Sequence, residues 1–239
     1  MIDVEDRDGV AVVRMAYGKV NALDLDLLRA ISGTFDELDR GGVPAVVLTG
    51  SERAFSAGVD LWKILDGGAD YVRQFLPALE AAFAAVFGIG KPTVAAINGH
   101  AIAGGAILAA ACDERVMSGG TLGVTEVLVG VPFPPVALNI LGHALGTKDA
   151  RRAVLTGTTL APQEALEAGH VDEIGPLKAA VARARRLAEI PPDTFRLTKA
   201  QLRAGVADAP PDPRVTELWI RAVEDGRIER FMQRTVRKP

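Results

Sequence analysis

The sequence has few of the residues that mark several common kinds of functional site. Its single cysteine, Cys112, permits no internal disulfide and lies in an apolar AAAC run, which indicates a small core residue and not a nucleophile. The three histidines, His100, His143 and His170, lack the spacing of metal ligands, so no metal site is expected. A phosphate loop of the G-x-x-x-x-G-K-[ST] type and a serine nucleophile elbow are also missing, which argues against a nucleotide or serine mechanism.

Long apolar runs and an excess of basic charge are missing as well. The longest apolar runs, such as Ala101 to Cys112, are interrupted by glycine and are shorter than the roughly 20 residues needed to cross a bilayer. The acidic start MIDVEDRDGV lacks both parts of a secretory signal, so we expect a cytoplasmic protein with no membrane partner. A net charge of -3 argues against a nucleic acid partner.

Basic residues gather near the C-terminus. They are Arg227, Arg230, Arg234, Arg237 and Lys238. A charge run of this kind is typical of a solvated tail, and a phosphate-binding role is the alternative.

The remaining composition favours a globular α/β protein. An apolar fraction of 49% in 239 residues is ample for a core. Short β-branched runs predict strands over Val10 to Met15, Ala45 to Thr49 and Thr93 to Asn98. Helical sequence follows each of them, which predicts an α/β arrangement. The expected helices are Asp24 to Leu38, ended by Gly41-Gly42, then Phe75 to Phe87, and Ala103 to Ala111, which is apolar on every side and therefore buried.

Prolines divide the C-terminal part of the chain. The segments EIPPD (Glu189 to Asp193) and ADAPPDPR (Ala207 to Arg214) separate helical pieces at Thr194 to Arg203 and Val215 to Arg234. We therefore expect a core over residues 1–190 and a C-terminal helical segment over residues 191–239.

Three motifs in order carry the strongest functional signal. They are AFSAGVDL (Ala54 to Leu61), NGHAIAGGAILAAACD (Asn98 to Asp113) and TEVLVGVPFP (Thr125 to Pro134). Together they resemble the crotonase family, also called the enoyl-CoA hydratase/isomerase superfamily, from about Val20 to about Arg203. The resemblance implies a spiral of strand-strand-helix units, acyl-CoA thioester substrates, and C-terminal helices that assemble subunits into trimers or hexamers. Packing of these helices on their own domain is the alternative.

The resemblance also implies where the substrate lies. The backbone N–H groups of Val59 and Gly104 would form the oxyanion hole for the thioester oxygen, and CoA is part of the substrate, so no separate cofactor is implied. Asp60 is expected to cap the helix that follows it. The remaining expected substrate and CoA contacts are Asn21, Ala22, Leu23, Ala57, Gly58, Ile107 and Phe133. Trp62, Leu65, Tyr71 and Phe75 either bound the acyl tunnel or form a helix packing face.

The acid–base residues set the predicted reaction. Hydratases of the family use two glutamates, and this chain matches the second at Glu126 but has Ile107 at the first. Since isoleucine cannot orient water, the chain is closest in motif to the Δ3,Δ2-enoyl-CoA isomerases. In these, one glutamate in a dry pocket moves a proton from C2 to C4. Val124, Val127, Leu128, Ile107 and Phe133 are the expected walls of that pocket.

Three alternatives stay open at this level. Glu126 taken alone could be an exposed acid in the first turn of a short helix, with Thr125 as its cap. The chain could be an enoyl-CoA hydratase with a rearranged water site, or an acyl-CoA binding protein without chemistry. Asp113 and Glu114 are expected to make structural contacts.

Overall fold

Two sheets of mostly parallel strands organise the chain, which is described here by a computed structural model covering residues 1–51 and 53–235. The larger sheet has the order β1-β2-β3-β5-β7-β10 and the smaller one β4-β6-β8-β9. The larger sheet consists of β1 (Ile2–Arg7), β2 (Val10–Met15), β3 (Ala45–Thr49), β5 (Thr93–Ile97), β7 (Glu114–Met117) and β10 (Glu173–Ile174). The smaller sheet consists of β4 (Ala54–Ser56), β6 (His100–Ile102), β8 (Leu122–Gly123) and β9 (Thr159–Leu160).

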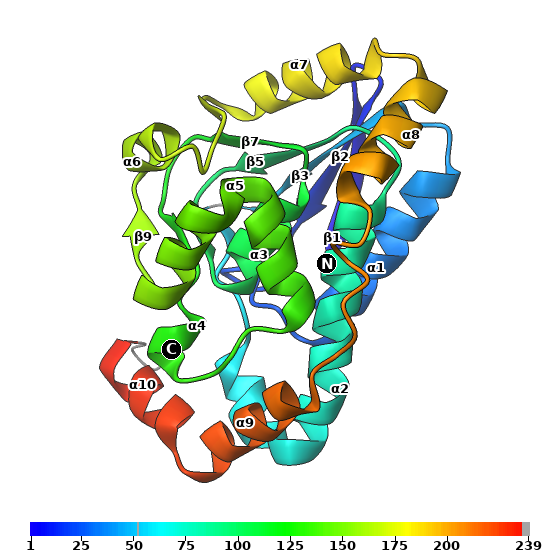
Figure 1. The fold of residues 1–239 in the computed structure, drawn as a ribbon. Coiled ribbons are helices and arrows are strands. Elements are labelled where there is room, and N and C mark those ends of the chain that lie inside the picture. The colour runs from blue at the N-terminus through cyan, green and yellow to red at the C-terminus, as the bar shows by residue number, and fades with distance from the viewer. Residues whose placement is uncertain (52, 236–239) are drawn as a thin grey trace.

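The helices alternate with these strands and then continue alone to the C-terminus (Figure 1). The helices of the first part are α1 (Leu25–Arg40), α2 (Leu61–Gly88), α3 (Gly104–Ala111), α4 (Glu126–Val129), α5 (Pro135–Thr156) and α6 (Pro162–Glu167). Those of the last part are α7 (Leu177–Ala188), α8 (Pro192–Arg203), α9 (Pro213–Glu224) and α10 (Arg227–Thr235). No helix of the described residues is both long enough and apolar enough to span a bilayer.

Successive chain segments repeat one unit. A strand enters the large sheet, a second enters the small sheet, and a helix follows, as in β3-β4-α2, β5-β6-α3 and β7-β8-α4. Neighbouring strands of successive units pair in parallel, β3 with β5, β5 with β7, β4 with β6 and β6 with β8. The predicted spiral of strand-strand-helix units is therefore confirmed.

The central strands β2, β3 and β5 of the large sheet are buried on both faces, which explains why they are nearly continuous apolar runs. On one face, Val12, Val47 and Val94 pack against Ala180 and Val181 of α7. On the other face, alternate residues of the same strands pack toward α1, α2 and α3.

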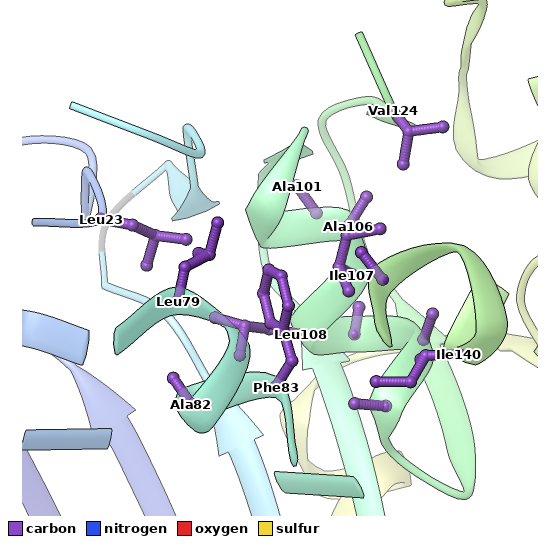
Figure 2. Close-up of a cluster of buried hydrophobic side chains, with 14 of the residues drawn as sticks. Leu23, Leu79, Ala82, Phe83, Ala101, Ala106, Ile107, Leu108, Val124 and Ile140 are labelled. Carbon is purple, nitrogen blue, oxygen red and sulfur yellow. The ribbon is translucent and has the colours of Figure 1, made fainter. Parts of the chain in front are cut away.

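Helix α3 lies at the centre of the core. Each of its residues is buried, as the uninterrupted apolar sequence predicted. Figure 2 shows Ile107 and Leu108 among side chains of α2 and α5, including Phe83 and Ile140. The core thus fixes the position of the first residue of this helix, Gly104.

Several element boundaries differ from the expected ones. The helix expected at Phe75 to Phe87 begins at Leu61 and bends at Gly68, whose φ of +57° is unfavourable for other residues. The single helix expected over Val215 to Arg234 is two helices, because Gly226 has a φ of +72° between α9 and α10. Strand β1 was not predicted, since its acidic residues suit an exposed edge better than a core.

The C-terminal helices pack on their own chain. Val215, Trp219, Ile228 and Met232 belong to the same apolar cluster as α2 and α3. Helix α8 is joined to residues 1–190 by the Lys199 and Arg203 ion pairs with Asp113. Arg237 and Lys238, part of the predicted basic tail, lie outside the described residues.

Candidate active site

The two loops expected to form the oxyanion hole meet at one edge of the small sheet. Strands β4 and β6 are parallel neighbours, so the segments that leave their carboxyl ends adjoin. A Cβ placed on Gly58 would lie 2.6 Å from the Ile102 carbonyl oxygen and 3.4 Å from the Gly104 nitrogen. The loop before Val59 therefore packs directly on the start of α3, and only a glycine fits at the contact.

The N–H groups of Val59 and Gly104 have no protein acceptor among the described residues. Leu23 donates to the Gly58 carbonyl at 2.7 Å and accepts from the Asp60 N–H at 2.9 Å, which leaves the intervening Val59 N–H outside this pairing. Gly104 is the first residue of α3, and helix starts carry N–H groups without an intrahelical acceptor. Both donors can therefore meet an oxygen that a ligand supplies.

Ala103 holds a strained backbone conformation next to these donors. Its φ of +53° and ψ of -124° are rare for a residue with a side chain, and such a conformation costs about 1–3 kcal/mol. The conformation turns the chain sharply from β6 into α3. Strain of this size is typical of positions where backbone geometry serves a site.

A cavity of about 340 Å³ lies beside the two loops. Val59 and Ala103 line it on one side, and Glu126 lines it from the start of α4. Trp62 of α2 and Trp219 of α9 form apolar walls. The predicted base and one predicted oxyanion donor, Val59, thus share this cavity, and Gly104 follows the lining residue Ala103 without being a wall itself.

Glu126 is buried in an apolar environment. Its side chain belongs to a residue that is 7% exposed, and its Oε2 atom has no hydrogen-bond partner among the described residues. Burial raises the pKa of Glu126 to about 8, and the backbone N–H groups of Glu126 and Thr125 offset only part of this shift. The alternative of an exposed acid capped by Thr125 is wrong, because the glutamate is buried and the threonine side chain makes no cap.

Other predicted contact residues divide into cavity walls and supports behind them. Ala22, Ala57 and Asp60 line the cavity. The fully buried Asn21 side chain donates to the Ala54 and Phe55 carbonyl groups, both at 3.1 Å, and so holds the strand that leads to Val59. The remaining predicted contacts, Leu23, Gly58, Ile107 and Phe133, are not among the cavity walls.

The walls also differ from the expected set. None of the five expected apolar residues lines the cavity, and Leu128 is 55% exposed. Val129, at the end of α4, and Val131, in the turn after it, line the cavity instead. Of the four residues expected to bound the acyl tunnel, Trp62 is a wall, whereas Leu65, Tyr71 and Phe75 are not.

Residues of the C-terminal helices were missed by the sequence reasoning. Trp219, Phe231, Met232 and Thr235 line the cavity. The apolar spacing of Val215, Trp219 and Ala222 indicates an amphipathic helix, but that spacing does not identify the surface that the helix covers.

Asp60 caps α2, as predicted. Its carboxylate accepts hydrogen bonds from the N–H groups of Trp62 and Lys63, both at 3.1 Å. Asp60→Ala is expected to destabilise the protein by about 1 kcal/mol and lower Tm by about 2–4 °C. Asp60→Asn keeps an acceptor oxygen and is the matched control in thermal unfolding; equal Tm values for the two variants would contradict the capping role.

An ion pair between the buried Asp24 and the half-exposed Lys63 supports the same region. Asp24, which is 1% exposed, caps α1 and accepts from the Tyr17 hydroxyl at 2.7 Å and from the Lys63 ammonium of α2. Burial alone would raise the pKa of Asp24, but the Leu27 N–H, the Lys63 ammonium and the Tyr17 hydroxyl hold it below its ordinary value. The starts of α1 and α2 are thereby joined on either side of the Leu23–Val59 contact.

A larger cavity of about 540 Å³ lies away from these residues, between the end of α3 and α8. Its Asp113 carboxylate accepts from Thr93, Lys199 and Arg203. Glu114 pairs with Arg183. The predicted structural role of Asp113 and Glu114 is confirmed by these contacts, which leave no unpartnered acid in that cavity among the described residues.

Comparisons with known proteins agree with the geometry. Residues 5–222 match the sequence model of the enoyl-CoA hydratase/isomerase family. A Thermus thermophilus protein named "Putative enoyl-CoA hydratase" is 37% identical over 238 residues, which is 94% of each chain. The mitochondrial enoyl-CoA delta isomerase 1 of Mus musculus is 30% identical over 217 residues, covering 87% of this chain and 75% of the relative. The crystal structure of human mitochondrial delta3-delta2-enoyl-CoA isomerase superposes with a TM-score of 0.85 at 26% identity, covering 98% of this chain and 95% of that one.

Proposed function

The chain belongs to the enoyl-CoA hydratase/isomerase family and is an enzyme of that family, and we propose that it acts as an isomerase that moves a 3-enoyl-CoA double bond to the 2-position. The observation that carries this proposal is the difference in hydrogen bonding between the two carboxylates that line the cavity. Among the described residues that line it, Asp60 is occupied by two helix N–H groups, whereas Glu126 has a free oxygen. One free carboxylate suits proton transfer between two carbons.

The proposed reaction is a balanced proton shift without a further cofactor. Glu126 takes a proton from C2 of the 3-enoyl thioester, and the electrons of that C–H bond move toward the carbonyl oxygen. The N–H groups of Val59 and Gly104 stabilise the negative charge on this oxygen, each donor contributing about 3–4 kcal/mol. Glu126 then returns the proton to C4, which yields the conjugated 2-enoyl thioester.

Burial of Glu126 assists this role. A carboxylate without water or a cation beside it binds a proton more tightly, so its basicity approaches that needed to deprotonate a thioester. Ile107, at the position where hydratases of the family carry another glutamate, is fully buried in α3 and supplies no acid. Hydration is the second candidate, because a relative at 37% identity carries the name hydratase.

Ultraviolet absorbance of the conjugated thioester distinguishes the candidates. We expect purified protein to convert a medium-chain 3-enoyl-CoA into a product whose absorbance rises and persists. The same protein mixed with a 2-enoyl-CoA is expected to leave the absorbance unchanged. Loss of the 2-enoyl signal would establish hydration instead, and ligand binding with no change in either assay would establish an acyl-CoA binding protein.

The pH dependence follows from the raised pKa of Glu126. The free enzyme acts as a base only when this carboxyl group is ionised, so kcat/KM is expected to rise about tenfold per pH unit below pH 8 and to level off above it. Initial rates between pH 6 and pH 9.5 at low substrate concentration test this, with acyl-CoA affinity measured at each pH as the control. A plateau already reached at pH 6 would contradict a base with this pKa.

Assembly and location stay predictions from the sequence. We infer a trimer or hexamer in the cytoplasm, with acyl-CoA as the partner molecule. The division into residues 1–190 and 191–239 is likewise a proposal. Apolar side chains of α9 and α10 join the main core, so the two parts share one apolar cluster. Sedimentation of the full chain measures the assembly directly.

A further inference from the structure

The C-terminal helices close the cavity of their own chain. Helices α9 and α10 lie together below α4 and beside α2 (Figure 1). Trp219 of α9 is 1% exposed and forms a wall of the cavity, and Phe231 and Met232 of α10 line it as well. The Trp219 ring also packs on Phe75 of α2, with ring centroids 6.4 Å apart. A large apolar surface therefore separates the space around Glu126 from solvent on this side.

The same helices are hydrogen-bonded to the turn that follows the base. The Trp219 indole N–H donates to the Pro132 carbonyl at 2.9 Å, and Arg227 donates to the Gly130 carbonyl at 3.1 Å. Within the turn, the N–H groups of Gly130 and Val131 donate to the Glu126 carbonyl at 3.0 and 3.2 Å. The indole is thus linked to the backbone of Glu126 through its hydrogen bond to Pro132, the chain from Pro132 to Val131, and the Val131 hydrogen bond to Glu126.

Water in this cavity would change the fate of the transferred proton. Between the two steps of a C2-to-C4 shift, the proton resides on the Glu126 carboxyl group. A water molecule within reach would exchange this proton with solvent, and a water held by the carboxylate could instead add to the double bond of the product. The buried Oε2 atom has no hydrogen-bond partner among the described residues, so a water that reached this carboxylate would be held by it.

We propose that Trp219 determines the outcome of the reaction. Its ring excludes water from Glu126 and its indole N–H fixes the turn after α4, so that the proton taken from C2 returns to C4 of the same molecule. This inference rests on the proposed isomerase function and assigns to the C-terminal helices a role in selectivity between isomerisation and hydration. Trp219 acts by shaping the site and takes no part in proton transfer.

The test follows the label in a 3-enoyl-CoA deuterated at C2 and converted in ordinary water. The product is analysed by mass spectrometry for deuterium at C4 and for any 3-hydroxyacyl-CoA. Wild-type enzyme is expected to retain most of the transferred label and to form no hydroxy product. Trp219→Phe, which keeps an aromatic ring but loses the indole N–H, is expected to lose part of the label. Trp219→Leu, which removes an aromatic wall of the cavity that Glu126 also lines, is expected to lose most of it and to form hydroxy product.

Leu218→Ala is the matched control. Leu218 precedes Trp219 on α9, but it is 36% exposed and does not line the cavity. Its variant is expected to retain the label as the wild type does. Circular dichroism verifies that each variant is folded. If Trp219→Leu does not fold, the label retained by Trp219→Phe alone tests the proposal.

The results distinguish the proposed role of Trp219 from the proposed isomerase function on which it rests. Absence of any isomerisation by the wild type would refute the proposed function and this proposal together. Isomerisation with complete loss of label in the wild type would leave the function intact and overturn the role of Trp219. Unchanged label retention in both Trp219 variants, with kcat alone reduced, would show a structural role and also overturn it.

Discussion

Glu126→Gln is expected to lower kcat for isomerisation by about 10⁴-fold, the upper end of the range for a general acid–base residue. Glutamine has nearly the same shape as glutamate but cannot take a proton from C2. Because the cavity walls and both oxyanion donors are unchanged, the Kd for a non-reacting acyl-CoA is expected to stay within a few-fold of the wild-type value. Single-turnover rates and calorimetric titration measure the two quantities separately. A matched loss of rate and affinity would point to disturbed folding and not to chemistry.

The same substitution is expected to stabilise the protein at alkaline pH. The pKa of Glu126 is about 8 in the folded chain, above its ordinary value of 4.5. Between these values the unfolded chain loses the proton that the folded chain holds, so the free energy of unfolding of the wild type falls as pH rises. Glutamine removes this dependence, and at pH 9 the variant gains up to about 5 kcal/mol relative to the wild type. Urea unfolding of both proteins at pH 5 and pH 9 measures the difference.

Glu80→Gln is the matched control for the loss of activity. Burial also raises the pKa of Glu80, which lies on α2 and does not line the cavity. Its variant is expected to keep the wild-type kcat, although it also removes a carboxylate of raised pKa. If Glu80→Gln reduced kcat as strongly as Glu126→Gln, the loss could not be assigned to a base at the cavity.

The sequence predicts the large sheet better than the small one. Val10–Met15 and Ala45–Thr49 are strands with the predicted bounds, because strands buried on both faces are continuous β-branched runs. Strands β4, β6 and β8 have three, three and two residues, too few to show a period of two. Their presence followed from the family resemblance and not from local pattern.

In the site as well, local sequence patterns predict some features, whereas others depend on residues that are distant in the sequence. A glycine pair before an apolar run predicts a tight helix start, and the structure places Gly104 there. Nothing in TEVLVG indicates that Glu126 lines a cavity, because other walls of that cavity come from α2, α9 and α10. Trp219 is 93 positions away in the sequence, so its contact with this cavity depends on the tertiary path of the whole chain.

Gly58→Ala is expected to lower kcat/KM by about 10²- to 10³-fold, the effect of losing one oxyanion donor. A Cβ at this position would lie 2.6 Å from the Ile102 carbonyl oxygen and 2.8 Å from the Ala103 Cβ, and these two residues lead directly into the buried helix α3. The loops after β4 and β6 must move apart, which displaces the Val59 N–H relative to the Gly104 N–H. Since both donors have to meet one oxygen, the transition state loses more than the ground state does.

Gly9→Ala is the control that distinguishes displacement of the two loops from backbone strain at a glycine. Gly9 and Gly58 have the same φ of +81°, so alanine is strained at both positions, but a Cβ on Gly9 has no neighbour within 4 Å. Gly9 lies in the turn between β1 and β2, at the far edge of the large sheet. Both variants are expected to have a lowered Tm, whereas kcat/KM is expected to fall in Gly58→Ala alone. If the activities of the two variants fell together, strain and lost stability would account for the effect, and the close packing of the two loops would have no part in placing the oxyanion donors.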